Sequence, residues 1–504
     1  MGREIYTTND QLGGPMIMFP NGVSHQLSVS HLETVSKALT WLAFVSPRKG
    51  IRFSLSEITF SDPVDRDIQF IPQKGMTYDP RNLLCGISTD GESDSRNSWI
   101  SGFFDKDSFV ETLGGWAKTV VVGRARLGGI PMGVIITENR TVEGTKPADP
   151  ADITSQEKMV QQAGGVWFPD SAYKTAQALR DFNREDLPCI IFANWRGFSG
   201  GQRDMFDEVL KFGSMIVDAL VAYKQPLFVY IPPHAELRGG AWVVVDSTIN
   251  ADVMEFYAAE DARGGVLEAT GAASIKFREK DIISTAHRLD GVLISLDEKI
   301  KSIHLVSEAT RDEELKRLRI QIKEREKMLF NVYQQVAVHF ADLHDTPGRM
   351  LAKGVIRRQV EWSKSRSFFY WRTCRRLTEF DIAKSIRELE PSTTSNKQAN
   401  LMLKSWFLSL DVDHSIWESD RDVLKWLQNN QSKLNAYLVS LRDKALSERL
   451  RDIFKKAITA ASAVSSNEES QVTNISTILR KSIESLCGTD KSKVLEAIRA
   501  LNES

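Results

Sequence analysis

The sequence predicts an α/β fold, chiefly because of the order of elements in one stretch, residues 190–242. A short apolar run that ends at Ala193 is followed by the Gly200-Gly201 break and by apolar residues at helical spacing. A second apolar run, Leu227–Ile231, stops at Pro232-Pro233. Strand, helix and strand in this order predict a crossover unit with two parallel buried strands. The expected inward residues of the helix are Phe206, Leu210, Met215, Val217 and Leu220.

Length and composition are those of a globular protein. The 504 residues leave room for roughly two to four domains, and 42% hydrophobic residues suffice for a large core. Lys plus Arg number 65 and Asp plus Glu 66, which gives a net charge of -1. This balance argues against a general nucleic-acid or anionic-membrane binder, so we expect no nucleic-acid partner.

Cysteine spacing and apolar runs bear on cellular location. No apolar run approaches the ~20 residues that cross a bilayer, and the N-terminal residues lack the basic-then-apolar order of a secretion signal. We therefore expect a cytoplasmic protein without a membrane span. The cysteines lack CxxC or Cys/His spacing, which favours reduced thiols and no metal site. They are Cys85, Cys189, Cys374 and Cys487.

The N-terminal third is predicted to alternate strands, turns and a few helices. Residues 1–72 indicate short strands followed by a helix over 32–45, and Asp107 or Ser108 is expected to cap a further helix. Strands at 119–122 and 132–136 flank a predicted hairpin turn that contains Arg124, Arg126 and the Gly128-Gly129 pair. The two arginines either form part of a site wall or are exposed hairpin charges.

The flanks of the central stretch carry further expectations. Residues 137–154 predict a loop, and a helix capped by Asp170 or Ser171 should follow, with Tyr173, Ala176 and Leu179 facing inward. After the stretch, residues 251–258 predict a helix. Residues 273–278 predict a strand with Lys276 and Arg278 on one face. Such a pair is either a phosphate clamp or a solvated strand face.

The C-terminal part is predicted to be helical. An amphipathic stripe more typical of core than of a cofactor site begins at Leu315 and ends at Leu343. The helix that follows is rich in arginine and aromatic residues, whose helical spacing favours packing over nucleic-acid binding. Residues 391–396 read as a linker, and 399–504 as a helical tail interrupted at 465–471. The predicted domains are residues 1–72, 73–392 and 393–504.

Two glycine pairs mark the candidate site. Gly200-Gly201 and Gly239-Gly240 are either plain tight turns or turns that bring backbone N–H groups close to a ligand, because no Cβ stands in the way. The sequence contains no G-x-S-x-G elbow, H-E-x-x-H motif or P-loop. A reaction that relies on backbone donors at developing oxyanions fits this pattern better than one that needs a side-chain nucleophile.

A set of motifs carries a family resemblance. FANWRGFSGG, a helix with DMF and EVLK, YIPP, ELRGG and WVVVD occur in this order. The chain thereby resembles the carboxyltransferase region of eukaryotic multidomain acetyl-CoA carboxylase. The resemblance implies a crotonase-like (ClpP/crotonase) spiral core with long helical insertions. The opening GREIYT-N-QLGG resembles a late segment of the family's N-terminal subdomain. We therefore expect an N-terminally truncated chain that lacks one oxyanion turn and is inactive by itself.

The same resemblance implies an activity and a cofactor. Carboxybiotin, held on a carrier domain outside this chain, would give its carboxyl group to acetyl-CoA and yield malonyl-CoA for fatty acid synthesis, with a biotin nitrogen as the base. The implied partners are the coenzyme A thioester, the biotin carboxyl carrier domain and a second copy of the chain in a homodimer.

Residue roles follow from the matching motifs. The resemblance implies that Gly239 and Gly240 donate N–H groups to the biotin ureido oxygen and that Arg196 holds the carboxylated reactant. Phe198 would line the biotin pocket. Residues 275–278 match the family's IKFR segment, so Lys276 and Arg278 would hold the coenzyme phosphates. His234 stands at a variable position and is not expected to be catalytic.

Two other functions remain open at this point. The chain could be a catalytically inactive fragment that binds acyl-CoA or dimerises with a full-length carboxylase. It could also belong to a carboxylase for another acyl-CoA, although those enzymes resemble the RGGAW motif only loosely.

Overall fold

The computed structural model describes residues 5–46, 62–89, 98–303, 308–390, 393 and 395–464, with single positions between 481 and 495. The chain divides into two compact units, Met1–Tyr370 and Trp371–Ser504. The predicted domain boundaries at 72 and 392 stay a prediction.

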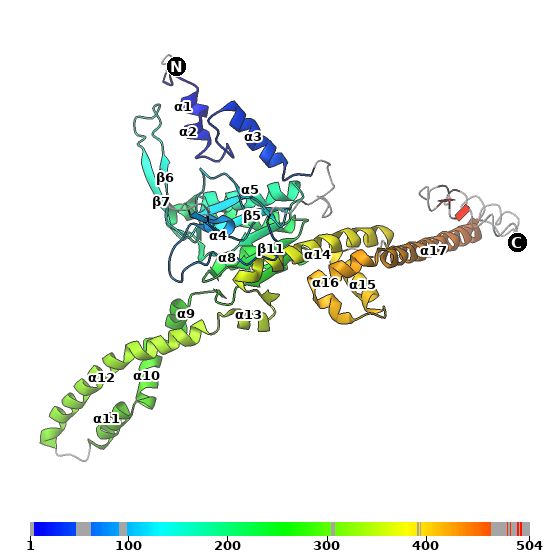
Figure 1. Cartoon of the computed structure of the whole chain (residues 1–504). Helices are drawn as coiled ribbons and strands as arrows, with labels where there is room; N and C mark the ends of the chain where they lie inside the picture. Colours follow the sequence, from blue (N-terminus) through cyan, green and yellow to red (C-terminus); the bar gives the residue numbers. More distant parts are fainter. Residues whose placement is uncertain are drawn as a thin grey trace. The chain divides into compact units, whose positions relative to one another are not determined.

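A seven-stranded sheet forms the core of the first unit (Figure 1). Its inner strands pair in parallel, and β3 and β4 extend one side antiparallel. Val229 pairs with Ile191 on one side and with Phe256 on the other. The predicted crossover unit with parallel buried strands is confirmed. In sheet order the strands are β15 (Arg358–Gln359), β13 (Met254–Ala258), β11 (Leu227–Ile231), β9 (Cys189–Phe192), β5 (Ile130–Thr137), β4 (Val120–Leu127) and β3 (Val110–Thr112).

A structural repeat winds around this sheet. After each of β9, β11 and β13 the chain forms a short strand and then enters a helix, and after β5 it does so once a hairpin at residues 142–162 has been completed. The short strands pair in parallel as β8 with β10 and β12 with β14. This arrangement is the crotonase-like spiral that the family resemblance implied, and the sequence itself shows no matching repeat. The short strands are β8 (Val166–Trp167), β10 (Gly197–Phe198), β12 (Glu236–Arg238) and β14 (Arg263–Gly265); the helices are α5 (Pro169–Arg184), α6 (Gln202–Phe206), α7 (Val209–Val221), α8 (Gly239–Val245) and α9 (Ala269–Lys276).

Local chemistry explains where two of these helices begin. α5 starts at Pro169, whose missing N–H costs nothing at the first helical position. Its N-cap is Phe168, and Ser171 accepts a hydrogen bond from the Phe168 N–H at 2.9 Å, so the predicted cap at Asp170 or Ser171 is wrong. Before α7, Glu208 adopts a left-handed φ of 68°.

The left-handed Glu208 changes which residues of α7 face inward. It breaks the predicted single helix into α6 and α7 and resets the helical phase. Val209 and Ile216 are therefore buried, whereas Phe206 and Leu210 are 86% and 61% exposed, contrary to prediction. Leu220 is buried as expected.

Several predicted elements have another structure. Residues 254–258 form strand β13 rather than a helix, because β11 and β15 supply backbone partners on both sides. Where short strands were predicted near the N-terminus, the chain forms two short helices, α1 (Asp10–Gly13) and α2 (Pro15–Met18). The helix predicted after them is present as α3 (His31–Leu42). No helix follows Asp107, because residues 110–112 pair with β4 as β3. The predicted loop contains β6 (Val142–Lys146), which forms a hairpin with β7 (Lys158–Gln162).

Helices α10, α11 and α12 pack on one another around a small apolar cluster. Leu318 and Ile322 of the predicted stripe are buried in it, but Val332 and Val336 are 58% and 63% exposed. The stripe is thus core at its start and surface near its end. The remaining elements of this unit are α4 (Pro80–Cys85), β1 (Gly86–Thr89), β2 (Ser98–Ser101), η2 (Ser247–Asn250), α10 (Glu279–Leu289), α11 (Gly291–Ser302), α12 (Glu308–Asp342) and α13 (Pro347–Ala352).

The second unit is helical, as predicted for the tail. Ser395 caps α15 by accepting from the Gln398 N–H at 3.2 Å. Phe407 and Trp417 lie in its apolar cluster. The predicted interruption at 465–471 and Cys487 lie outside the described residues. Its elements are the later part of α14 (Trp362–Leu389), α15 (Asn396–Leu408), η4 (His414–Glu418), α16 (Asp420–Asn429) and α17 (Gln431–Val464).

In the part of the chain that the structure describes, no helix is both long and apolar enough to cross a bilayer. Cys85, Cys189 and Cys374 are free thiols.

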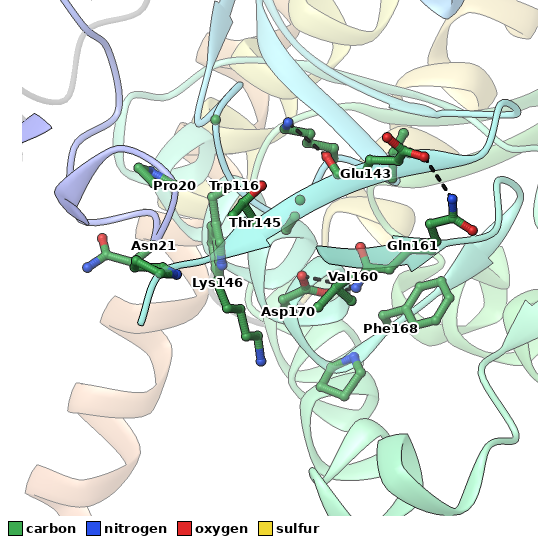
Figure 2. Close-up of a pocket in the computed structure, with 18 of the residues that line it drawn as sticks. Pro20, Asn21, Trp116, Glu143, Thr145, Lys146, Val160, Gln161, Phe168 and Asp170 are labelled. Carbon is green, nitrogen blue, oxygen red and sulfur yellow. Dashed lines mark hydrogen bonds between the residues drawn. The ribbon is translucent and has the colours of Figure 1, made fainter. Parts of the chain in front are cut away.

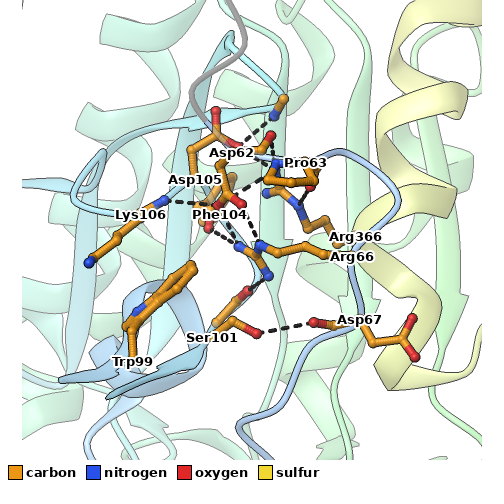
Figure 3. A network of polar contacts seen from close by, with 12 residues as sticks. Asp62, Pro63, Arg66, Asp67, Trp99, Ser101, Phe104, Asp105, Lys106 and Arg366 are labelled. Carbon is orange, nitrogen blue, oxygen red and sulfur yellow. Dashed lines mark hydrogen bonds and ion pairs between the residues drawn. The ribbon is translucent and has the colours of Figure 1, made fainter. Parts of the chain in front are cut away.

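A buried ion network joins α14 to the sheet (Figure 3). The fully buried Arg366 guanidinium donates to Asp105 Oδ1 at 2.6 Å and to the Phe103 carbonyl at 3.0 Å. The same Asp105 carboxylate accepts from the N–H groups of Gly128 and Gly129 at 2.8 and 2.7 Å. One carboxylate therefore fixes both the β4–β5 turn and the start of α14.

We predict that Arg366→Ala lowers the free energy of unfolding by about 3–5 kcal/mol, because it leaves the Asp105 charge buried without its cation. Lys364→Ala, two residues earlier on the same helix, is the control. Lys364 and its partner Asp67 are 61% and 51% exposed, so the loss should stay below about 1 kcal/mol. Urea unfolding of both variants measures the difference, and equal losses would contradict the prediction.

Candidate active site

The carboxyl ends of the parallel strands bring the two predicted motifs together. The NWRGF turn follows β9, and the ELRGG turn follows β11. The Arg238 N–H donates to the Trp195 carbonyl at 2.8 Å, and the Glu236 N–H donates to Asn194 Oδ1 at 3.0 Å. These hydrogen bonds tie the two turns edge to edge, as expected for a site at the carboxyl ends of parallel strands.

The glycine pair Gly239-Gly240 begins α8. Gly239 has a left-handed φ of 49°, and a Cβ there would lie 3.3 Å from the Val266 carbonyl oxygen. Gly240 has no such backbone demand, but a Cβ on it would lie 3.4 Å from the Phe198 ring. The first N–H groups of a helix have no partner within the helix, so this turn can present backbone donors beside the Phe198 ring.

An aromatic stack supports Phe198. Its ring lies 5.2 Å from that of Trp167, which stacks at 4.1 Å on Trp195. Both tryptophans are fully buried. On the α7 side, a Cβ on Gly213 would come within 2.8 Å of the Phe198 ring. The sequence analysis missed Trp167, Trp195 and Gly213, although two tryptophans beside predicted turns were a usable signal.

Arg196 reaches solvent from the same turn. Its side chain is 74% exposed, and its Nε lies 3.2 Å from Glu236 Oε1. The Arg196 N–H donates to the Gly165 carbonyl at 2.8 Å, which fixes the backbone while the guanidinium stays accessible. Arg196, Phe198, Gly239 and Gly240 are thus brought together as predicted from the motifs, while their roles stay predictions.

Lys276 and Arg278 do not lie on a strand, and this prediction is wrong. Lys276 is the last residue of α9, and Arg278 is the N-cap of α10. Small residues at 271–274 allow a helix, which packs on α12 and is followed by a Phe277–Phe340 ring contact at 6.0 Å. Both cations are exposed, and neither forms an ion pair with another described residue. They therefore lie on either side of Phe277, at the junction between α9 and α10, rather than on one face of a strand.

Arg124 and Arg126 lie inside β4, not in the hairpin turn. Arg124 is 5% exposed, and its Nε donates to Glu185 Oε2 at 2.7 Å. The Arg126 guanidinium lies 5.1 Å from the Phe44 ring centre and donates to the Gly129 carbonyl at 3.1 Å. They are therefore not exposed hairpin charges, because β4 continues to Leu127 and the turn consists of Gly128 and Gly129.

A cavity of about 590 Å³ lies in the same unit (Figure 2). Its walls come from the segment around Met16, the Gly115–Lys118 turn, the β6–β7 hairpin and the starts of α5 and α6. Arg196, Phe198, Gly239 and Gly240 do not line it. The candidate active site is therefore a surface formed by two turns and not this cavity.

The Lys174 ammonium hydrogen-bonds to the Gly115–Lys118 turn, which forms part of the cavity lining. This fully buried ammonium donates to the carbonyls of Leu113 at 2.9 Å and Trp116 at 2.8 Å. The turn it grips contains left-handed φ angles at Leu113 (59°) and Ala117 (46°). Burial lowers the pKa of Lys174 to about 7, despite these acceptors.

Comparison with known proteins identifies the family. The profile of the carboxyl transferase domain matches residues 1–377. The chain belongs to this family. Among curated relatives, it is 50% identical over 453 residues to acetyl-CoA carboxylase of Dictyostelium discoideum and 47% identical over 456 residues to that of Schizosaccharomyces pombe. These matches span 88% and 90% of this chain.

This carboxyl transferase chain spans 19% of the length of those relatives. A further relative, from Saccharomyces cerevisiae and 47% identical over 459 residues, is called "Acetyl-CoA carboxylase, mitochondrial". Transcarboxylase 12S with hydrolysed methylmalonyl-coenzyme A bound is a solved structure with a TM-score of 0.48 at 16% identity, over 72% of this chain and 55% of that one. That structure is too distant to assign a ligand here. The predicted family resemblance is confirmed by the curated relatives.

We predict that Lys174 gives stability a pH dependence of definite sign. Its folded pKa of about 7 lies below the ordinary 10.5, so between these values the unfolded chain binds a proton that the folded chain has released. The unfolding free energy of the wild type relative to Lys174→Met should rise as pH increases from about 7 toward 10 and stay level below about pH 7. Urea unfolding at several pH values tests this, and a difference that falls over the same window would contradict it.

Proposed function

We propose that this chain is the carboxyltransferase part of an acetyl-CoA carboxylase, which transfers a carboxyl group from carboxybiotin to acetyl-CoA. The observation that supports this most is the union of the NWRGF and ELRGG turns in a chain 47–50% identical to acetyl-CoA carboxylases. The direct test is biotin-dependent formation of malonyl-CoA by the carboxylase that contains this chain. Absence of transfer in that enzyme would overturn the proposal.

The residues beside the glycine turn fit a biotin ring system. No heavy atom lies within 4 Å of a Cβ built on Gly197 or Gly200, so the space beside the turn is open. The Phe198 ring offers an apolar face, and the exposed Arg196 guanidinium offers a cation for a carboxylate. Biotin on a carrier domain would supply the carboxyl group and a basic nitrogen. Gly239 and Gly240 would donate N–H groups to a developing oxyanion, a contribution worth about 3–4 kcal/mol per donor.

The coenzyme would lie along α9. The Val266 carbonyl is next to Gly239, and α9 begins at Ala269 in the same connection. An eight-residue helix spans about 12 Å, which separates the cations at its far end from the glycine turn. Lys276 and Arg278 would hold the coenzyme phosphates there, away from the reacting acyl group.

The assembly and the location remain part of the proposal. We infer a homodimer and a cytoplasmic enzyme that receives biotin from a carrier domain. The alternative function is an inactive chain that binds acyl-CoA or dimerises with a complete carboxylase. Acetyl-CoA binding without carboxyl transfer in the complete enzyme would favour that alternative.

We predict that Gly240→Val in the carboxylase lowers kcat for carboxyl transfer about 100-fold or more. The branched side chain would cover the Phe198 ring and block approach to the backbone donors. Gly144→Val is the control, because a Cβ at Gly144 in β6 meets nothing within 4 Å. Steady-state kinetics are read beside the unfolding midpoint. Retention of more than about a tenth of the activity would mean that the pair is only a turn.

We also predict that Lys276→Ala combined with Arg278→Ala weakens acetyl-CoA binding at least tenfold, because charge-assisted contacts contribute about 1.5–3 kcal/mol each. The loss should shrink at high salt, which screens exposed charges. Lys299→Ala in α11 serves as an exposed control. Calorimetric titration of the chain with acetyl-CoA at two ionic strengths provides the measurement. An affinity equal to that of the control would show that Lys276 and Arg278 are solvated surface charges that do not bind the coenzyme.

A further inference from the structure

A chain of ion pairs runs beneath the glycine turn. Arg196 Nε lies 3.2 Å from Glu236 Oε1, and Arg238 Nε donates to Glu236 Oε2 at 3.1 Å. Arg238 Nη1 donates to Asp345 Oδ2 at 2.5 Å. The side chains become less exposed from Arg196 at 74% to Arg238 at 5%. The exposed arginine of the candidate site is thus linked to a buried one.

Arg238 also reaches the segment that leads to α9. Its Nη1 donates to the Leu267 carbonyl at 3.0 Å, and α9 begins two residues later at Ala269. Its own backbone precedes Gly239 and donates to the Trp195 carbonyl. Arg238 therefore contacts three segments that the proposed function needs: the NWRGF turn through its backbone N–H, and its own turn and the approach to α9 through its guanidinium.

Asp345 is seated for this contact. A Cβ on Gly265 would lie 2.7 Å from Asp345 Oδ1, so the carboxylate occupies the space that any larger side chain at 265 would need. The Asp345 carbonyl accepts from the Gly264 N–H at 3.0 Å. Because a buried arginine is costly without its partners, Asp345, Glu236 and the Leu267 carbonyl together keep Arg238 in one position.

We propose that Arg238, held by Asp345, is a positioning residue that fixes the Gly239-Gly240 donors relative to α9. This inference rests on the proposed function and extends it to residues that touch no substrate. The left-handed φ of Gly239 gives the turn little intrinsic stability, so the guanidinium on the preceding residue keeps the donors in place.

The chain contains a matched control for this role. Asp342, three residues earlier, accepts from Arg263 Nε at 2.8 Å and Nη2 at 3.0 Å. Arg263 pairs with Glu236 in the β12–β14 ladder, so both aspartates anchor arginines of neighbouring short strands to the end of α12. Of these two aspartates, Asp345 is the one that accepts a hydrogen bond from Arg238.

The first experiment is amide hydrogen exchange on the ligand-free 504-residue chain, which requires no activity. We expect Asp345→Asn to increase exchange of the Arg238 amide, whose N–H donates to the Trp195 carbonyl, at least tenfold and Asp342→Asn to leave it within twofold of the wild type. Gly265→Ala, which displaces the Asp345 carboxylate, should reproduce the Asp345→Asn result while keeping both charges. Equal exchange in the two aspartate variants, or no increase in either, would overturn the proposal. Global unfolding midpoints are recorded beside it, and an increase confined to the Glu236 and Arg238 amides, which link the two turns, separates positioning from lost fold.

The second experiment uses the carboxylase that contains this chain. Asp345→Asn should lower kcat about tenfold or more while the KM for acetyl-CoA stays within threefold, because misplaced donors act on the transition state. Asp342→Asn should leave both unchanged. An unchanged kcat in Asp345→Asn with increased exchange would refute the positioning role. Absence of activity in the wild-type enzyme would instead refute the proposed function, which the exchange result does not depend on.

Discussion

Parallel pairing of β9, β11 and β13 is the constraint on which the candidate site depends. Each strand in a parallel set ends at the same edge, so whatever follows it must emerge there. The turns with Arg196 and Gly239, and the Val266 segment, follow these three strands in turn. Trp195 and Arg238, which are 43 residues apart in the chain, are thereby joined by a hydrogen bond. The sheet therefore brings backbone N–H groups of separate turns to one edge, where the Arg238 side chain links them to the segment before α9.

The sequence predicted elements well where local and tertiary forces agree. Leu227–Ile231 is apolar, flanked by prolines and fully buried, so pattern and structure coincide. A helix was predicted over residues 251–258, but residues 254–258 form a strand although Glu255 interrupts their apolar run. In the fold that carboxylate accepts hydrogen bonds from Tyr257 at 2.7 Å and from Arg357 at 3.1 Å. These bonds offset the free-energy cost of burying a glutamate within a strand. Arg357 is about 100 residues away, and no local pattern contains it.

The candidate site shows the same division. Gly239 could be predicted because its left-handed backbone conformation favours glycine, so the residue type itself marks the turn in the sequence. Arg238 could not, because its role depends on Leu267 and Asp345, which lie far from it in the sequence. The two cations at Lys276 and Arg278 were identified by motif but misplaced on a strand. A spacing of two fits a strand face, and it fits equally a helix end followed by the next N-cap.

Two turns of this fold are each held by a buried arginine that donates to several acceptors. Arg366 and Arg238 each satisfy a carboxylate and at least one backbone carbonyl, so their desolvation is offset by contacts that also define a turn. Removing any one acceptor leaves the charge under-satisfied, which penalises every alternative turn geometry. Arg196 is the opposite case, with one carboxylate partner and most of its surface in water. Its side chain costs little to redirect, so in the proposed function it would follow a bound carboxylate while Arg238 holds the donors in place.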